Sequence, residues 1–339
     1  MQNIDWDNLG FDVTETRSMY KAMCKMGEEW EFGGLIPYGK IELSPAAGVL
    51  NYGQGCFEGT KAYRTITNQV VLFRPEMNAK RMTMSTRRLC IPEMNKEFFL
   101  QAVEKTLKDN IDYVPPYGKG SLYIRPIVWG TSPALGVKPV KEYTFIVFVS
   151  PVGPYFKGGM KPLRLTVSND YHRAAPKGIG SAKAIGNYSA SLYPLTEAKN
   201  RDFDEVIYLN AKDEKFVEEV GSANLFVLTG NTIKTPKLDG SILPGITRDS
   251  VITLAKDTIG LEVLETNVTL TELYDADEVF CTGTAVVVTP VGNITGLDGK
   301  HKIADGKMGQ LTSKLRQLLT GIQRGDLSDE FGWLYPIKE

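Results

Sequence analysis

The chain has 339 residues, of which 42% are hydrophobic and 23% are charged, as in an ordinary globular protein. Its 39 Lys and Arg residues and its 40 Asp and Glu residues nearly cancel, leaving a formal charge of -1. No overall field would therefore attract nucleic acid or an anionic membrane surface. The longest apolar runs, at 145–149 and 285–288, have the length of a strand, far below the ~20 residues of a membrane-spanning helix.

The N-terminal stretch MQNIDWDNLGFD has neither the basic nor the apolar region of a secretory signal, so we expect a cytoplasmic protein. The two histidines, His172 and His301, lie away from cysteines and from paired carboxylates, which argues against a zinc site. The cysteines show no CxxC spacing, and we expect all of them to be reduced thiols: Cys24, Cys56, Cys90 and Cys281.

The first part of the chain is predicted to contain several strands and two helices. One helix, at 75–89, begins with Pro75 at its first position. The other, at 95–111, has Asn95 as its cap and an apolar residue every four positions. Short runs rich in β-branched and aromatic residues predict strands at 39–44, 69–73, 121–129 and 143–150.

The segment PVGPYFKGGM, at 151–160, concentrates proline and glycine without a hydrophobic period, which is typical of a linker. We therefore predict an N-terminal domain at 1–152, a linker at 153–160 and a C-terminal domain at 161–339. Two domains also agree with a usual domain size of roughly 150 residues.

The second part of the chain again mixes strands with fewer helices. Helices are predicted after residue 187, after residue 247 and at the C-terminal end, where leucines keep helical spacing. Strands are predicted at 163–168, 205–210, 223–236, 261–268 and 284–294. Because strands outnumber helices and do not alternate with them regularly, an α+β fold is favoured over a doubly wound parallel sheet.

The common nucleotide and hydrolase motifs are missing. GxxxxGK[ST] and GxSxG do not occur, and GQGCFEG at 53–59 is one residue too long for GxGxxG. A candidate anion site lies instead in ILPGITRDS, where Ile246 and Thr247 open a predicted helix whose first N–H groups could bind a phosphate. The alternative is a simple threonine N-cap. The turn Gly283-Thr284-Ala285 could add donors, although such a turn is also an ordinary hairpin.

Two further segments carry groups that could be catalytic. In KFVEEVGSANLF, Glu218 and Glu219 would point to opposite faces of a strand, so one of them would face inward and require a cation or a protonated ring. An exposed edge strand is the alternative. In SAKAIGNY, Lys183 lies among small residues that would admit a flat ring, and a neutral lysine amine attacks carbonyls. Lys177, nearby, is interpreted as a surface residue.

Six motifs taken together resemble the branched-chain aminotransferases, which are fold-type IV enzymes that use pyridoxal 5'-phosphate (PLP). The motifs are KAIGNY, VEEVGSANLF, LPGITRDS, TGTAVVV, YGQGCFEGTKAYR and YIRPIVWGTSPALGV, and the similarity runs from about residue 30 to about residue 325. The resemblance implies a two-domain α+β fold with a smaller N-terminal α/β domain, a larger C-terminal mixed domain that is β-barrel-like, and the site between them. It also implies a homodimer.

The resemblance implies a role for each cofactor-binding residue. Lys183 would be the Schiff-base and proton-transfer residue, and Glu219 would keep the pyridine nitrogen protonated, with Glu218 as the surface member of the pair. Tyr188 would donate to the phenolate oxygen. The phosphate would be bound by a guanidinium, backbone N–H groups and a hydroxyl, supplied by Arg81, Ile246, Thr247 and Thr284. The role of Arg74 stays open.

The resemblance also implies two kinds of substrate contact. An apolar pocket would accept the side chains of leucine, isoleucine and valine. A difference of one methylene changes the binding free energy by only ~1 to 3 kcal/mol, so all three should react. The walls of this pocket would be Tyr52, Phe57, Val137, Tyr155 and Tyr188, with Tyr52 and Val137 coming from a second subunit. Tyr123, Thr284 and Ala285 would bind the α-carboxylate, and Arg125 the distal carboxylate of glutamate. A structural ion pair is the alternative for Arg125.

The implied reaction is ping-pong transfer of an amino group from a branched-chain L-amino acid to 2-oxoglutarate. Two alternatives remain open at this point: a D-amino acid aminotransferase or aminodeoxychorismate lyase on the same fold, and a protein that binds a phosphate ligand without catalysis. Some eukaryotic relatives carry a CxxC pair after the GTA turn, whereas this chain has GTAVVVTPV there. A thiol switch of that kind is therefore not expected.

Overall fold

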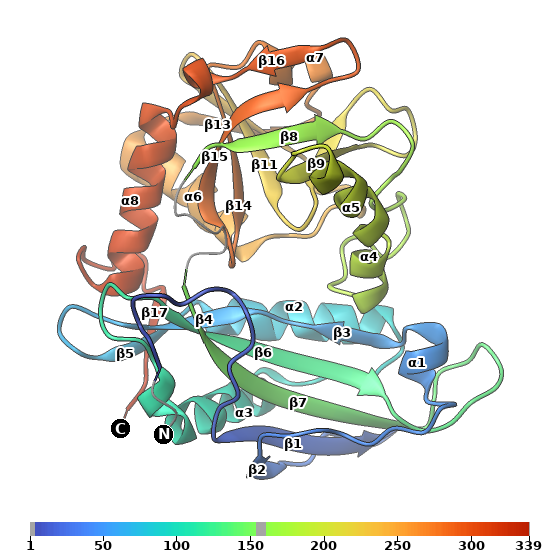
Figure 1. The fold of residues 1–339 in the computed structure, drawn as a ribbon. Coiled ribbons are helices and arrows are strands. Elements are labelled where there is room, and N and C mark those ends of the chain that lie inside the picture. The colour runs from blue at the N-terminus through green and yellow to red at the C-terminus, as the bar shows by residue number, and fades with distance from the viewer. Residues whose placement is uncertain (1–3, 154–160, 339) are drawn as a thin grey trace. The chain divides into compact units, whose positions relative to one another are not determined.

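The computed structural model describes residues 4–153 and 161–338 and divides into two compact units (Figure 1). The first unit contains the described residues up to 153 together with 182–185 and 321–338, and the second contains 161–181 and 186–320. The last two segments of the first unit therefore lie outside the N-terminal domain that the sequence predicted. Residues 154–160 of the predicted linker, Tyr155 among them, lie outside the described residues.

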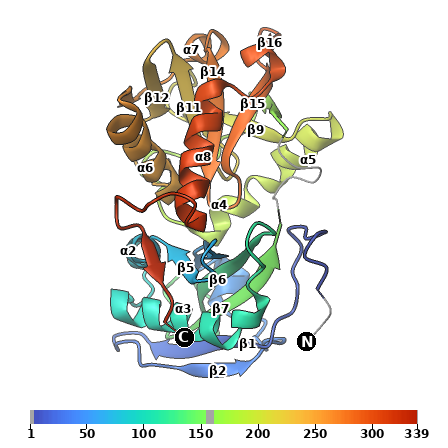
Figure 2. The same cartoon turned by 90° about the vertical axis from the view of Figure 1, so that its left-hand side faces the viewer.

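The first unit is built on one antiparallel sheet of eight strands, ordered β17-β5-β4-β6-β7-β1-β2, with β3 also paired to β6. The strand bounds are β1 Ser18–Lys25, β2 Gly34–Pro37, β3 Gly55–Phe57, β4 Thr60–Arg64, β5 Val70–Phe73, β6 Ser121–Gly130, β7 Glu142–Val152 and β17 Leu334–Pro336. The C-terminal strand β17 thus joins the sheet beside β5 (Figure 2).

Helices α2 (Pro75–Arg88) and α3 (Lys96–Asp109) share one apolar core with this sheet. Asn95 caps α3 as predicted, since its side chain accepts a hydrogen bond of 2.8 Å from the Phe98 N–H. Phe98 and Phe99 of α3 are buried against Phe145 of β7. Two shorter helices complete the unit: α1 (Gly48–Tyr52) and the 3-10 helix η1 (Ile111–Tyr113).

The second unit is built on a mixed sheet of nine strands, ordered β10-β9-β8-β15-β14-β11-β12-β13, with β16 paired to β15. Three of its pairs are parallel, namely β8 with β9, β8 with β15, and β12 with β13. Figure 1 shows that this sheet curls. The bounds are β8 Leu163–Val167, β9 Glu205–Leu209, β10 Val217–Val220, β11 Asn224–Thr229, β12 Thr232–Pro236, β13 Glu262–Thr266, β14 Glu278–Gly283, β15 Val287–Thr295 and β16 Lys300–Lys302.

The helices of the second part of the chain lie between these strands and after them. The Glu278 carboxylate accepts hydrogen bonds of 2.9 and 2.8 Å from the Leu311 and Thr312 N–H groups, so an anion stabilises the N-terminus of the last helix. The bounds are α4 Ile185–Ser189, α5 Leu192–Asn200, α6 Ile246–Thr253, the π-helix η2 Leu254–Ile259, α7 Leu270–Tyr274, the 3-10 helix η3 Ala304–Gly306 and α8 Gln310–Arg324.

Most predicted elements are confirmed, but the strand at 39–44 is wrong. The chain is extended at β2 instead, where Pro37 pairs with Ser18, and residues 39–44 form no strand. The strand predicted at 284–294 begins only at Val287, because Thr284 to Val286 form a turn. The segment around Glu218 and Glu219, considered as a strand from the sequence, is strand β10. The strands that were not predicted are β1, β2, β3, β4, β14, β16 and β17.

The four cysteines are free thiols, as expected, and Cys90 is the exposed one. Among the described helices, none has both the length and the apolar character needed to cross a membrane.

Candidate active site

The segment that carries Lys183 is fixed to the first unit by its main chain. The Lys183 N–H donates a hydrogen bond of 3.0 Å to Ser85 Oγ, and its carbonyl accepts one of 3.1 Å from the Phe57 N–H. Ala184 forms an isolated bridge with Cys56. The small residues around the lysine let this strand-like segment lie against β3. The two hydrogen bonds and the bridge hold the backbone of Lys183, while its side chain stays half-buried.

Phe57 lies beside the lysine side chain, Arg125 lies beside Phe57, and Tyr123 lies beside Arg125. The Lys183 Nζ lies 4.9 Å from the Phe57 ring centroid, and the Arg125 guanidinium carbon lies 4.6 Å from the same centroid. Arg125 also donates a hydrogen bond of 3.1 Å to the Tyr123 hydroxyl. Tyr123 and Arg125 share one face of β6, whereas Leu122 and Ile124 face the core, because side chains alternate along a strand.

Arg125 forms no ion pair with any carboxylate in residues 4–153 and 161–338, which argues against the structural ion pair that the sequence left open. Its Nε is buried and has no hydrogen-bond partner among those residues. The guanidinium instead stacks on Phe57 and on Tyr123, whose ring centroid lies 5.2 Å away. A stacked guanidinium keeps its in-plane N–H groups directed outward, where a ligand carboxylate can accept from them.

Arg81 of α2 lies in the first unit, but it is bound to a carboxylate of the chain itself. Its Nε and Nη2 donate to the two carboxylate oxygens of Glu58 at 2.7 and 2.8 Å, and both side chains are buried. Burial alone would raise the pKa of Glu58. The charge and hydrogen bonds of Arg81, the charge of Lys183 and a hydrogen bond from Asn78 outweigh burial and lower that pKa.

Arg74 is the N-cap of α2 and adopts a left-handed backbone with φ of 50°. Its backbone N–H donates to the Trp333 carbonyl at 2.8 Å, and its guanidinium lies 5.1 Å from the Trp333 ring centroid. These contacts explain Arg74 as an anchor for the C-terminal segment that ends in β17.

The predicted walls of the apolar pocket are only partly near one another. Phe57 lies beside Lys183, as described above. Tyr52 ends α1 and is 39% exposed, and Val137, in the loop between β6 and β7, is 90% exposed. Tyr155 lies outside the described residues.

The second unit contains a buried carboxylate held by several groups. Glu219 is 2% exposed and accepts hydrogen bonds from the Leu243 N–H and from Asn224 Nδ2. The Arg173 Nε lies 3.4 Å from Glu219 Oε2. The Arg173 Nη2 donates to the carbonyls of Gly180 and Ser241, so its direction is fixed by the main chain.

Glu218 is not the surface residue that the sequence predicted, because it is 1% exposed. Its Oε1 accepts hydrogen bonds from Ser241 Oγ at 2.6 Å and from Asn210 Nδ2 at 3.0 Å. Burial raises the pKa of Glu218, against the lowering effects of Ser241 and Arg173. β10 does lie at the edge of its sheet, but both of its faces are covered, so the alternative in which both acids are exposed is wrong.

Ile246 and Thr247 begin α6 as predicted, and both are buried. The N-cap is Gly245 and not a threonine, so no side chain caps this helix end. A Cβ atom at Gly245 would collide with the Asn224 side chain, which explains the glycine. A helix N-terminus without a side-chain cap has N–H groups that a phosphate can accept from.

The remaining predicted residues of the second unit lie in short turns and helices. Thr284 and Ala285 are half-buried in the turn that joins β14 to β15. Tyr188 is half-buried near the end of α4, and its carbonyl accepts a hydrogen bond of 2.8 Å from Ser191 Oγ.

The structure thus places the predicted residues in two groups, one in each unit. Glu58 and Arg173, which contact two of the predicted residues, were missed. Glu58 directly follows Phe57 in a motif already singled out. A charged residue next to a predicted buried strand could have indicated a buried ion pair. Arg173 had no such signal, because its contacts depend on segments far along the chain.

A known protein family matches most of this chain. The model of the amino-transferase class IV family matches residues 55–294. The chain belongs to this family. Among curated class IV relatives, branched-chain amino acid aminotransferase 2, chloroplastic, of Humulus lupulus is 49% identical over 333 residues, 98% of this chain and 81% of that protein. The branched-chain-amino-acid aminotransferase of Mycolicibacterium smegmatis is 44% identical over 338 residues, 96% of this chain and 92% of that protein.

Solved class IV structures are similar as well. The branched-chain amino acid aminotransferase of Escherichia coli has a TM-score of 0.82 at 29% identity, covering 96% of this chain and 100% of that one. The enzyme of the same name from Thermobaculum terrenum, solved in its PLP-form, has a TM-score of 0.79 at 25% identity, with 96% and 99% covered. The predicted resemblance to branched-chain aminotransferases and the predicted fold-type IV architecture are both confirmed.

Proposed function

We propose that this chain transfers the amino group of L-leucine, L-isoleucine or L-valine to 2-oxoglutarate by a ping-pong reaction, with PLP as its cofactor. Membership of the class IV aminotransferases and the identity to branched-chain aminotransferases support the reaction. The observation that carries the assignment to residues is the position of Lys183, whose backbone is fixed on both sides while its amine lies beside Phe57.

The residues present fit the cofactor. A protonated pyridine nitrogen needs a buried carboxylate, and Glu219 is one. A phosphate dianion needs N–H donors, and the N-terminus of α6 has no side-chain cap. We assign Lys183, Tyr188 and Glu219 to the cofactor ring, and Ile246, Thr247 and Thr284 to its phosphate. Arg81 is assigned to the phosphate too, although its Nε and Nη2 are directed at Glu58.

PLP supplies an aldehyde that combines with amines and a ring that withdraws electrons from the substrate Cα. The protein contributes proton transfer and orientation. The Lys183 amine would take the proton from Cα of the amino acid as a general base and deliver it to C4′ of the cofactor as a general acid. Glu219 would keep the ring nitrogen protonated, and Tyr188 would donate a hydrogen bond to the ring oxygen.

Two carboxylate sites and one apolar wall account for two substrates. We assign the α-carboxylate to Tyr123, Thr284 and Ala285, and the distal carboxylate of glutamate to Arg125. The side chains of branched-chain amino acids would contact Phe57, with Tyr155 as a further wall. The absence of an acidic partner for Arg125 within the described residues supports its role.

We also propose a homodimer. An open apolar groove of about 320 Å³ runs over one face of the first-unit sheet, lined by Trp129, Ile146 and Phe148 among others. Leu50 at its edge is 60% exposed. Apolar surface of this kind usually marks an interface, and a second copy would cover it while supplying Tyr52 and Val137. Sedimentation of the wild type and of Leu50→Asp tests the dimer.

The cytoplasmic location expected from the sequence stays a proposal, because the Humulus lupulus relative is named chloroplastic. Fractionation of the source cells would test it.

A panel of amino donors with 2-oxoglutarate as acceptor tests the reaction. We expect turnover of L-leucine, L-isoleucine and L-valine, and none of D-alanine. Lys183→Ala should lower turnover by about 10⁴-fold or more, because it removes both the covalent and the proton-transfer group. Turnover of D-alanine without L-leucine would favour a D-amino acid aminotransferase, and normal turnover by Lys183→Ala would contradict the assignment.

A further inference from the structure

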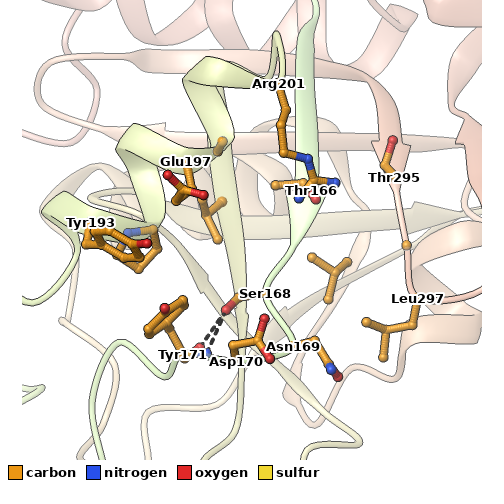
Figure 3. Close-up of a pocket in the computed structure, with 15 residues that line it drawn as sticks. Thr166, Ser168, Asn169, Asp170, Tyr171, Tyr193, Glu197, Arg201, Thr295 and Leu297 are labelled. Atoms are coloured by element: carbon orange, nitrogen blue, oxygen red, sulfur yellow. Dashed lines mark hydrogen bonds between the residues drawn. The ribbon is translucent and has the colours of Figure 1, made fainter.

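A second pocket, lined by residues of the second unit alone, has no part in the proposed reaction. It is open to solvent, has a volume of about 470 Å³, and lies where the C-terminal end of β8, helix α5 and the turn after β15 meet (Figure 3). None of the residues assigned to cofactor or substrate lines it. Its volume falls in the usual range of small-molecule sites, roughly 300 to 1,000 Å³.

Charged groups of both signs line this pocket without pairing. Glu197 and Arg201 are four positions apart at the end of α5, a spacing at which opposite charges often pair. Neither of them, nor Asp170, has a side-chain hydrogen bond or an ion pair with another residue that the structure describes. Elsewhere in this unit such groups do pair, as Arg164 does with Asp204. The pocket therefore presents a cation and two anions that a ligand can contact.

The cation is held in a suitable orientation. The Arg201 guanidinium carbon lies 5.3 Å from the centroid of the Phe203 ring, so the guanidinium packs over an aromatic face. In this arrangement its in-plane N–H groups can donate to a planar carboxylate. Thr166, which is 8% exposed, lines the same pocket and adds a hydroxyl.

The rest of the pocket offers apolar and aromatic surface. The rings of Tyr171 and Tyr193 meet edge to face with centroids 5.7 Å apart. Leu297 is 53% exposed. Figure 3 shows the two tyrosines at one side of the pocket and Leu297 at the other, with the charged side chains between them. An aliphatic side chain of a ligand could bury its apolar surface against these residues, which favours binding.

We propose that this pocket binds a free α-amino acid as a zwitterion with an apolar side chain. Arg201 and Thr166 bind its carboxylate, Glu197 and Asp170 bind its ammonium group, and the two tyrosine rings contact its side chain. A phosphate would be repelled by the two carboxylates, and a simple cation would be repelled by Arg201. A zwitterion satisfies both signs of charge at once, and this site is independent of the catalytic assignment.

Calorimetry can detect the site in the presence of the catalytic one. L-leucine is titrated into borohydride-treated holoenzyme, in which the reduced bond between Lys183 and the cofactor prevents L-leucine from reacting at the catalytic site. We expect one L-leucine site per chain, weakened about tenfold by Arg201→Gln and by Glu197→Gln, because each removes a hydrogen bond to a charged group. Lys199→Gln is the matched control, since it removes a charge from the same helix outside the pocket lining.

Several results would overturn the proposal. Binding that is unchanged in both variants, or no binding beyond the catalytic site, would show that the pocket takes no amino acid. Displacement of L-leucine by 3-methylbutylamine as strong as by L-leucine itself would show that the carboxylate is not recognised. Normal transamination by Arg201→Gln at low L-leucine is expected, whereas failure of the catalytic proposal would appear as absent turnover in the wild type.

Discussion

Each unit of the molecule buries one glutamate against one arginine, and the two pairs differ in geometry. In the first unit, Arg81 makes two contacts with Glu58, at 2.7 and 2.8 Å, and Asn78 adds a third at 2.7 Å. In the second, Arg173 approaches Glu219 at 3.4 Å, while its Nη2 donates to main-chain carbonyls. One pair is a bidentate bridge, and the other is a looser approach.

The difference indicates two uses of a buried carboxylate. A bidentate pair with a further amide donor satisfies both oxygens, so it fixes α2 against the strand that precedes Glu58. A looser pair keeps the carboxylate negatively charged and in position without satisfying both of its oxygens by hydrogen bonds from the arginine. We infer that Arg173 positions Glu219 for a cationic ring, whereas the main task of Glu58 is to hold Arg81.

The largest expected effect is on stability, from Glu58→Gln. Removing one member of a buried pair leaves the other charge uncompensated, which costs about 3 to 5 kcal/mol. Urea unfolding should therefore show a free energy of unfolding lower by about that amount. Glu93→Gln is the control, because its bidentate pair with Arg87 is exposed and should contribute at most about 1 kcal/mol. Equal losses in the two variants would contradict the distinction.

Glu219→Gln should act mainly on catalysis. The amide cannot keep the ring nitrogen protonated, and removing a preorganised electrostatic group lowers kcat by about 10² to 10³-fold. Stopped-flow absorbance of the half-reaction with L-leucine would measure this. Glu218→Gln, the same change one position earlier in β10, should leave kcat nearly unchanged. If both variants lose activity equally, Glu219 has no special relation to the cofactor.

The comparison also marks where sequence reasoning succeeded. Helix α3 could be predicted because Asn95 and the apolar positions at steps of four lie within one segment. Lys183 and the start of α6 were found for the same reason. By contrast, Glu58 reaches Arg81 across 23 positions and Arg173 reaches Ser241 across 68, and a local pattern records neither contact.

The strand predicted at 39–44 shows the opposite error. Its residues have β-propensity, but propensity depends on a pairing partner, and here β2 has already paired with β1. Ile41 and Leu43 line the apolar groove instead. The surface position that the resemblance implied for Glu218 is also wrong, because β10 is covered on both faces.

Glu205 extends the comparison to a buried glutamate that forms no ion pair with any residue the structure describes. Burial raises its pKa from 4.5 to about 7, against a hydrogen bond from Val206 and the charge of Lys199. The folded protein therefore keeps this proton between pH 4.5 and 7, whereas the unfolded chain releases it. Stability should fall as pH rises through this window, by about 3 kcal/mol in all.

Urea unfolding at about pH 5 and at about pH 7.5, which span most of this window, would detect the loss of stability. In Glu205→Gln, most of this dependence of stability on pH should disappear. Gln matches the neutral form that the fold prefers at low pH. A wild type and variant with the same change in free energy between the two pH values would show that Glu205 is not the group responsible.

Arg125 supplies the converse case, an arginine without a carboxylate partner among the described residues. If its partner is the distal carboxylate of a substrate, Arg125→Gln should raise the KM for 2-oxoglutarate and L-glutamate about tenfold to a hundredfold, because a hydrogen bond to a charged group contributes about 1.5 to 3 kcal/mol. The KM for L-leucine should change little, since that side chain is apolar. Arg125→Lys, which keeps the charge but not the stacked plane, should recover only part of the loss. A KM for L-leucine that rises as much as that for L-glutamate would instead mean that the guanidinium supports the walls formed by Phe57 and Tyr123, and Arg125 would then resemble Arg81, an arginine whose partners lie within the chain.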